Sequence, residues 1–430
     1  MYRKTAKKLL KFIEKSPTAF QAVTEMTKRL DKEGFEELKE EDHWKLKKGG
    51  NYYVTRNHSA IIAFSIPQKP VWKFHIMASH SDSPTYRIKE QPEMSVEKHY
   101  TKLNIERYGG MIPETWFDRP LSVAGRIIIE ENGQIKDQLV NIDRDLMIIP
   151  NLAIHMSRSS NESKQLNPQK DLLPLCGGNL TKDGFEEMIA KESGVEKEDI
   201  LAYDLFLYNR MRGTTLGINE EFVAAPKLDD LECAYSSIEG ILNAKLSKDY
   251  VTVCAVFDNE EVGSGTKQGA GSTFFPEVLK RISYLCEKNE EEYYMAVADS
   301  FMLSADNAHA VHPNYQDKTD PTNRPYINEG IVLKYNASQK YTTDANSAAL
   351  VKYLCKKEKI KCQVFFNRSD MLGGSTLGNI LTGQVSIKAA DIGLPQLSMH
   401  STYETAGCKD LDDMITLMGS FYELGKEVQI

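Results

Sequence analysis

An apolar run that ends in a cluster of acids constrains the fold of this chain more than any other feature. The run spans residues 250–257 and reads Tyr-Val-Thr-Val-Cys-Ala-Val-Phe, and Asp-Asn-Glu-Glu follows at 258–261. This pattern predicts a buried strand that runs into a turn. Successive side chains at a strand end point in different directions, so one of Glu260 and Glu261 can face a metal while the other faces a water bound to that metal. A Glu-Glu pair is common on any surface, so this interpretation depends on further acid or histidine turns elsewhere.

Length and composition predict a soluble globular protein with two domains. A chain of 430 residues exceeds what one hydrophobic core usually holds. Hydrophobic residues make up 41% and charged residues 27% of the chain, which is ordinary for a globular protein. The net charge is −8 and there is no basic run, which argues against nucleic acid or an anionic membrane as the main partner.

The N-terminus and the cysteines predict a cytoplasmic location. The first residues are too polar for a signal peptide, and no apolar stretch is long enough to cross a bilayer. The seven cysteines are odd in number and contain no Cys-x-x-Cys motif. Most of them stand in apolar surroundings, as small core residues do, so we expect a reducing compartment.

The pattern of apolar and polar residues changes twice along the chain, which predicts an α/β domain interrupted by a mostly β insertion. Residues 1–90 begin with a helical pattern and continue with strand-like runs, and the alternation of strands and helices returns at 222–430. Residues 91–221 contain short alternating runs, with a hairpin signal at Glu131-Asn132-Gly133. In open α/β sheets, ligands gather at the carboxyl ends of strands, which is where the acid and histidine turns fall.

Two of these turns offer metal ligands in the first and last parts of the chain. His80 follows the strand-like run 71–78 and can present one ring nitrogen to a metal ion. Asp82, two residues later, can accept a hydrogen bond from the N–H of the other ring nitrogen. Asp229 and Asp230 stand where a helix begins. We expect Asp230 to cap that helix, which leaves Asp229 with two oxygens that can bridge two cations. Taken singly, the first turn is better explained as a surface turn and the second as a helix cap.

Two further turns complete a candidate ligand set. Asp306 follows an apolar run, and His400 follows a strand-like segment. Two histidines and three carboxylates without a thiolate suit two zinc ions, or zinc with cobalt or manganese. If one carboxylate bridges, the set leaves room for water, as in an open catalytic two-metal site. The remaining early histidines are expected to be structural or solvent-facing: His43, His58, His75 and His99.

Sequence blocks in a fixed order along nearly the whole chain carry a family resemblance. They lie at 16–20, 79–84, 108–110, 115–122, 149–155, 258–264, 304–315 and 396–401. In this order they resemble the aspartyl aminopeptidase family, which also contains the yeast vacuolar aminopeptidase I.

The resemblance implies a dinuclear zinc aminopeptidase of the α/β class, in which helices sandwich a mixed sheet and a mostly β dimerisation domain interrupts the fold. It also implies a homo-oligomer, a tetrahedral dodecamer built from dimers. The metal ligands carried over by motif are His80, Asp229, Glu261, Asp306 and His400, with Asp229 bridging. Glu260 would be the general base, and Asp82 would orient His80.

Three finer features also follow from the resemblance. His155, in the insertion, resembles the family histidine that enters a neighbouring subunit's active site. Lys334 falls where the family places a lysine facing an acidic substrate side chain, although a lysine there can also turn to solvent. The Asp229–Asp230 peptide bond is expected to be cis.

One block departs from the family. After His400 the chain reads Ser-Thr-Tyr-Glu, where relatives often carry an arginine before the glutamate.

The expected activity is release of N-terminal residues, mainly Asp and Glu, from peptides by metal-activated water with Glu260 as base. One alternative is another hydrolase built on the same ligands, such as a deacylase or a carboxypeptidase-like enzyme. The blocks between residues 108 and 155 argue against it. Another alternative is a non-catalytic shell or cargo protein. Such a protein would be expected to lack Glu260 or a ligand, and none is missing.

Overall fold

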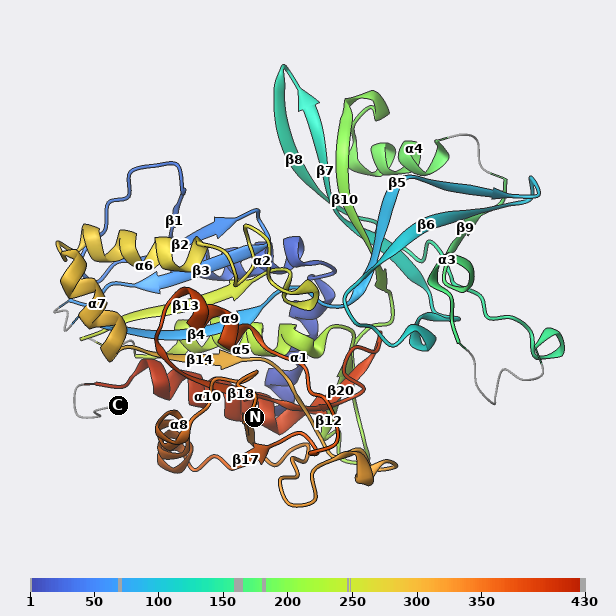
Figure 1. Ribbon diagram of the computed structural model, residues 1–430. Helices are drawn as coiled ribbons and strands as arrows, with labels where there is room; N and C mark the ends of the chain where they lie inside the picture. Colours follow the sequence, from blue (N-terminus) through green and yellow to red (C-terminus); the bar gives the residue numbers. More distant parts are fainter. Residues whose placement is uncertain are drawn as a thin grey trace.

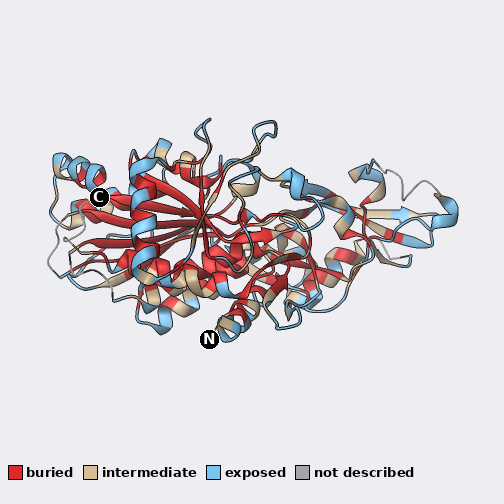
Figure 2. Cartoon of the chain, turned by 90° about the horizontal axis from the view of Figure 1, so that it is seen from below, coloured by how far each residue is buried: buried red, intermediate tan, exposed pale blue. Residues whose placement is uncertain are grey.

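The computed structural model describes residues 2–68, 72–157, 165–179, 183–245, 247 and 249–425. These residues form a large α/β body and a smaller β-rich arm (Figure 1). Buried residues dominate the body, whereas exposed residues dominate the tip of the arm (Figure 2). In the described part of the chain, no helix is both long and apolar enough to span a lipid bilayer.

A nine-stranded mixed sheet forms the centre of the body. Its strands, in spatial order, are β1 (Glu36–Leu38), β2 (Asn51–Arg56), β3 (Ala60–Ser65), β13 (Val251–Phe257), β4 (Phe74–His80), β14 (Phe301–Ala305), β18 (Lys388–Gly393), β16 (Ile331–Lys334) and β17 (Cys362–Phe365). The four central strands β13, β4, β14 and β18 are parallel, and antiparallel β3 and β16 flank them. The α/β fold predicted from the sequence is confirmed. The predicted strand at 71–78 begins only at Phe74, and Val71 lies outside the described residues.

Helices cover both faces of this sheet. One hydrophobic core contains side chains of α1 (Tyr2–Glu14), α2 (Ala19–Lys32), α5 (Leu228–Asn243), α8 (Ala345–Glu358) and α10 (Cys408–Tyr422). The opposite core contains side chains of α6 (Phe274–Leu285), α7 (Glu290–Asp299) and α9 (Leu377–Gln384). Along β13, Cys254 and Val256 belong to the first core, and Val253 and Ala255 belong to the second. The 250–257 run is apolar throughout because both faces of its strand are buried.

The arm is built on a six-stranded sheet with its own hydrophobic core. Its strands, in spatial order, are β8 (Gln134–Asn141), β7 (Leu121–Glu131), β10 (Ile200–Asn209), β5 (Thr85–Val96), β6 (Tyr100–Tyr108) and β9 (Leu175–Gly177), and its α-helices are α3 (Pro168–Asp171) and α4 (Gly184–Ser193). The predicted hairpin turn joins β7 to β8. A side chain at Gly125 of β7 would place its Cβ 1.9 Å from the Asp204 carbonyl oxygen, so only glycine permits this approach to β10.

A third, five-stranded sheet was not predicted from the sequence. Its strands, in spatial order, are β11 (Thr214–Leu216), β12 (Phe222–Ala225), β20 (Glu404–Gly407), β19 (Pro395–Leu397) and β15 (Ala308–His309). Each has two to four residues, too few to produce a recognisable alternation of apolar and polar side chains. In this sheet Ala225 pairs with Glu404, which brings the segment before α5 beside the segment that follows His400.

Candidate metal centre

Side chains from three neighbouring strands meet at one edge of the nine-stranded sheet. β4 ends at His80, β13 runs into the turn that carries Glu260 and Glu261, and Asp306 directly follows β14. These strands are adjacent and parallel, so their carboxyl ends lie side by side. The first turn of α5 adds Asp229, and the loop between β19 and β20 adds His400.

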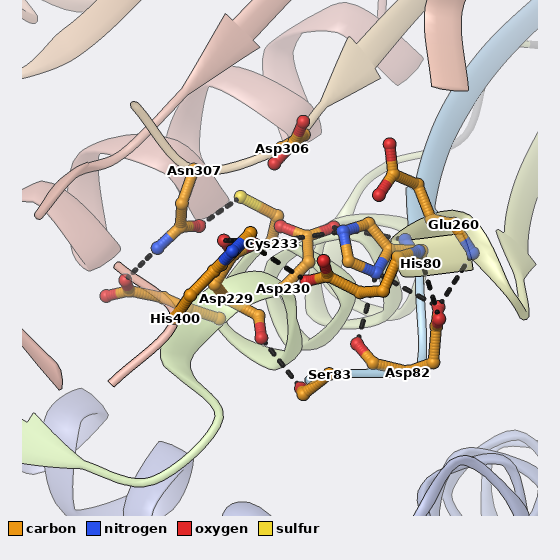
Figure 3. Close-up of polar contacts among 12 residues, drawn as sticks. His80, Asp82, Ser83, Asp229, Asp230, Cys233, Glu260, Asp306, Asn307 and His400 are labelled. Carbon is orange, nitrogen blue, oxygen red and sulfur yellow. Dashed lines mark hydrogen bonds and ion pairs between the residues drawn. The ribbon is translucent and has the colours of Figure 1, made fainter. Parts of the chain in front are cut away.

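The structure brings all five predicted ligands together with Glu260. Ligand-type atoms approach within 4.8 Å of one another in three groups: His80, Asp229, Asp230 and Asp306; His80, Glu260 and Glu261; and Asp229, Glu261 and His400. Figure 3 shows His80, Asp229 and Asp230 side by side, with Glu260, Asp306 and His400 around them.

Asp229 faces two histidines with its two oxygens. Its Oδ1 lies 3.7 Å from His80 Nε2, and its Oδ2 lies 3.4 Å from His400 Nε2, which is also 3.4 Å from Glu261 Oε1. Two atoms that each lie about 2.0–2.1 Å from a tetrahedral zinc ion are about 3.4 Å apart. The Asp229 side chain is 3% exposed, and its Oδ1 has no hydrogen-bond partner among the described residues. These contacts suit a carboxylate that bridges two zinc ions.

The electrostatics of the site also favour cations. Burial, followed by the charges of neighbouring carboxylates, raises the pKa of Glu260 to about 8 and raises the pKa of Glu261 above its ordinary value. For Asp229, burial acts to raise the pKa, but the hydrogen bond from His400 and the charge of His80 outweigh it and lower the pKa. Crowded buried carboxylates are costly unless positive charge is near, and bound metal ions supply such charge.

Asp82 connects the histidine turn to the Glu-Glu turn. His80 Nδ1 lies 3.1 Å from the Asp82 carbonyl oxygen and 3.2 Å from Asp82 Oδ1, which leaves Nε2 directed at Asp229. The same carboxylate accepts the backbone N–H groups of Glu260 and Glu261 at 3.1 and 3.2 Å. One carboxylate therefore holds the ring of a candidate ligand and the backbone of two acids.

Asp230 does not cap α5, so this prediction is wrong. Asp229 and Asp230 both have non-helical dihedral angles, so the regular part of α5 begins after them. Among the described residues, no N–H of that helix donates to the Asp230 carboxylate, and its Oδ1 has no hydrogen-bond partner. The buried carboxylate of Asp230 instead accepts the backbone N–H of His80 at 3.0 Å. The expected cis peptide bond between Asp229 and Asp230 is present.

Lys334 is buried beside the centre and does not turn to solvent. Its ammonium donates to the carbonyl oxygens of Asp306 and Asn307 at 2.7 and 3.0 Å, and it lies 3.3 Å from Asp306 Oδ2. The partner of Lys334 is Asp306, which is 28 residues away, so it could not be recognised among the sequence neighbours of the lysine.

His155 lies apart from the centre. It belongs to the short helix η2 (Ile154–Met156) of the arm and is exposed. Within the described part of this chain, no hydrogen bond or ion pair joins it to a residue of the metal centre.

The arm supplies residues whose roles the sequence did not reveal. The Tyr108 hydroxyl donates to Asp82 Oδ2 at 2.7 Å, and the Gly110 carbonyl oxygen lies 2.7 Å from His400 Nδ1. Gly109 between them has φ +81, and a Cβ there would lie 3.1 Å from the Cβ of Glu261. A glycine is needed at this point because the backbone is left-handed and pressed against an acid of the site. The Tyr-Gly-Gly block was the only available signal.

Comparisons with known proteins agree with the fold. Residues 12–422 match the family described as aminopeptidase I zinc metalloprotease (M18). The chain is 48% identical over 432 residues to a probable M18 family aminopeptidase 2 of Clostridium novyi (strain NT), with 98% of this chain and 99% of the relative covered.

Solved structures extend this agreement. Ape4, in a complex with Nbr1, superposes with a TM-score of 0.95 at 36% identity, covering 98% of this chain and 86% of that one. The S. cerevisiae mApe1 dodecamer gives a TM-score of 0.84 at 27% identity, covering 97% and 96%. The fold and the cluster of histidines and acids define an α/β metallopeptidase. The chain belongs to the M18 family of zinc metalloproteases and is a metalloaminopeptidase.

Proposed function

We propose that this metalloaminopeptidase works with two zinc ions and releases N-terminal residues from peptides, with a preference for Asp and Glu. The observation that carries the two-ion proposal is the placement of Asp229 between His80 and His400, at 3.7 and 3.4 Å. One ion would be held by His80, Asp229 and Asp306, and the other by Asp229, Glu261 and His400. Cobalt or manganese could replace zinc at such oxygen and nitrogen donors.

Glu260 is the proposed general base. Bound zinc ions lower the pKa of water and polarise a carbonyl group. Glu260 would take a proton from the water as that water attacks the scissile carbonyl carbon, and it would return the proton to the amine as the C–N bond breaks. Its backbone N–H is held by Asp82 at 3.1 Å, so the side chain starts from a fixed point. The acidic surroundings would also hold the α-ammonium group of the substrate, which restricts cleavage to the N-terminal residue.

Lys334 is the proposed source of the acidic preference. Its side chain is 3% exposed, and its ammonium lies 3.3 Å from Asp306 Oδ2. A carboxylate that binds a metal shares its charge with the ion, which would free the ammonium to interact with an acidic substrate side chain. A charge-assisted contact of this kind is worth about 1.5–3 kcal/mol, or about tenfold to over a hundredfold in discrimination.

We also propose that the chain assembles into a dodecamer built from dimers with tetrahedral symmetry, and that residues 91–221 form the dimer contacts. The S. cerevisiae mApe1 structure is a dodecamer. In this chain, Leu152, Ile154 and Met156 are 51%, 47% and 76% exposed around His155. Such an apolar cluster suits burial in an interface, and His155 would then enter a neighbouring subunit's site.

The seven free thiols fit a protein of the reducing cytoplasm.

Metal content and substrate range test the proposal together. The purified protein should contain two zinc ions per chain and hydrolyse Asp- and Glu-nitroanilide faster than Leu-nitroanilide. Removal of zinc by a chelator should abolish hydrolysis, and added zinc should restore it. One zinc ion per chain at saturation would contradict the two-ion site. Equal rates on the three substrates would contradict the acidic preference.

Lys334→Leu separates the two roles that its position allows. If Lys334 contacts the substrate, kcat/KM should fall by about tenfold to over a hundredfold on Asp-nitroanilide and be spared on Leu-nitroanilide. Equal losses on both substrates, together with lower zinc content, would instead mean that Lys334 only holds Asp306 in place.

A further inference from the structure

Glu404 holds two candidate ligands through their backbone. Its Oε2 accepts the N–H of Asp229 at 3.0 Å, and its Oε1 accepts the N–H of His400 at 2.7 Å. The side chain is only 1% exposed. One carboxylate therefore spans two loops that are far apart in the sequence, and each of its oxygens serves one of them.

The two loops need this acceptor because neither belongs to the regular part of a helix or strand. His400 has a left-handed backbone (φ 67), and Asp229 has non-helical dihedral angles (φ −80, ψ 110) in the first turn of α5. A buried N–H without an acceptor is costly. Glu404 also lies at the start of β20, where it pairs with Ala225 of β12. The third sheet therefore fixes the position of Glu404.

We infer that Glu404 is a positioning residue that sets the separation of Asp229 and His400 and thereby the affinity of one of the two metal sites. Asp229 Oδ2 and His400 Nε2 lie 3.4 Å apart, and both backbones meet at this carboxylate. His80, at the other site, has its N–H held by Asp230 at 3.0 Å. The inference rests on the proposed two-zinc function. Asp229 would contact both ions, but only the site with His400 would take two ligands whose backbones Glu404 holds.

Glu404→Gln is the sharpest test because it keeps the shape of the side chain. Glutamine has one acceptor oxygen, so its amide N–H₂ must face one of the two N–H groups. Metal-depleted protein is titrated with zinc against a chromophoric chelator. Wild type should bind two ions. Glu404→Gln should bind the second ion, which is held by Asp229 and His400, about tenfold or more weakly, and it should weaken the ion held by His80 much less, because only Asp229 is shared by both ions.

Glu232→Gln is the matched control. Glu232 is fully buried near the centre, and its carboxylate accepts from the Asn307 side chain at 3.2 Å and from no candidate ligand. This variant should bind both ions as wild type does. If only Glu404→Gln weakens the second ion, the effect belongs to the two backbone contacts and not to the loss of a nearby buried charge.

The outcomes are separable. A single zinc ion in wild type would overturn the two-zinc proposal itself. Two ions in wild type and two equally tight ions in Glu404→Gln would overturn the role of Glu404 alone, as would equal weakening of both ions in a folded variant. If circular dichroism shows that Glu404→Gln does not fold, Glu404→Asp is titrated instead. It keeps two acceptor oxygens but withdraws them by one methylene, and undiminished affinity for the second ion would overturn the inference.

Discussion

At the scale of single residues, Glu260 and Glu261 are neighbours in the sequence with different surroundings. Glu261 Oε1 lies 3.4 Å from His400 Nε2, whereas in the described part of the chain Glu260 forms no ion pair at that distance. The two acids lie in a short 3₁₀ helix, Glu260–Val262, in which successive side chains point about 120° apart, so they can take different roles.

Glu260→Gln and Glu261→Gln should therefore fail in different ways. Glu260→Gln should keep two zinc ions and lose about two to four orders of magnitude in kcat, because only proton transfer is removed. Glu261→Gln should contain less zinc. Turnover and zinc content, measured on the same preparations, check both expectations. Near-normal turnover in the first variant, or full zinc occupancy in the second, would refute the corresponding role.

The hydroxyl of Tyr108 links the arm to the metal centre by a hydrogen bond to Asp82. Tyr108→Phe removes the hydrogen bond that the hydroxyl donates to the Asp82 carboxylate at 2.7 Å and the one that it accepts from Asn259 Nδ2 at 2.8 Å. The free energy of unfolding of the metal-free protein should fall by about 1.5–3 kcal/mol, the worth of a hydrogen bond to a charged group. Denaturant unfolding measures this change.

Tyr86→Phe is the control for that experiment. Tyr86 is fully buried in the same sheet of the arm, and its hydroxyl has no hydrogen-bond partner among the described residues. Its removal should leave stability unchanged or slightly improved, because a buried unpaired hydroxyl is itself costly. Equal losses in the two variants would show that the contacts of the Tyr108 hydroxyl with Asp82 and Asn259 contribute nothing specific.

At the scale of elements, β4 carries a buried histidine as well as a candidate ligand. His75 packs against the rings of Tyr250 and Phe421, with centroids 4.6 and 5.1 Å away. Burial, and then the charge of Lys73, lowers the pKa of His75 to about 3. The neutral imidazole therefore belongs to the folded core of this strand.

His75 should make the folded protein sensitive to acid. Its folded pKa is below the unfolded value of about 6.5, so its contribution is complete above that pH and is lost as the pH falls toward 3. At pH 5, this loss amounts to about 2 kcal/mol. His75→Phe should lack it. Denaturation midpoints of wild type and variant at neutral pH and at pH 5 check the difference. Parallel acid losses in the two proteins would contradict this role for His75.

At the scale of the whole molecule, the exposed helix around His155 is the part of the structure that a neighbour would complete. If His155 acts in trans, His155→Ala and Glu260→Gln subunits should each be inactive alone. Mixed oligomers should recover part of the activity, because some sites then combine an intact His155 with an intact Glu260. Activity is measured after dissociation and reassembly, with the mixture verified by mass. No recovery in verified mixed oligomers, or a fully active monomer, would rule out the shared site.

The sequence by itself determined the elements that depend on local pattern. The 250–257 run predicted β13, because a strand buried on both faces must be apolar throughout. The turns that carry His80, Glu261, Asp306 and His400 could be located because ligand-type side chains follow apolar or strand-like runs, and Asp229 because it stands where a helix begins. The β-rich arm could also be anticipated from its alternation and from its hairpin signal.

Only the tertiary structure decided which groups hold these side chains in place. Asp230 accepts the N–H of His80, which is 150 residues away, and Glu404 accepts the N–H of Asp229, which is 175 residues away. Lys334 pairs with Asp306, and the short strands of the third sheet pair with one another. These interactions join backbone groups or single charges across long separations. A backbone N–H is present at every residue except proline, so the sequence carries no mark of which acid will accept it.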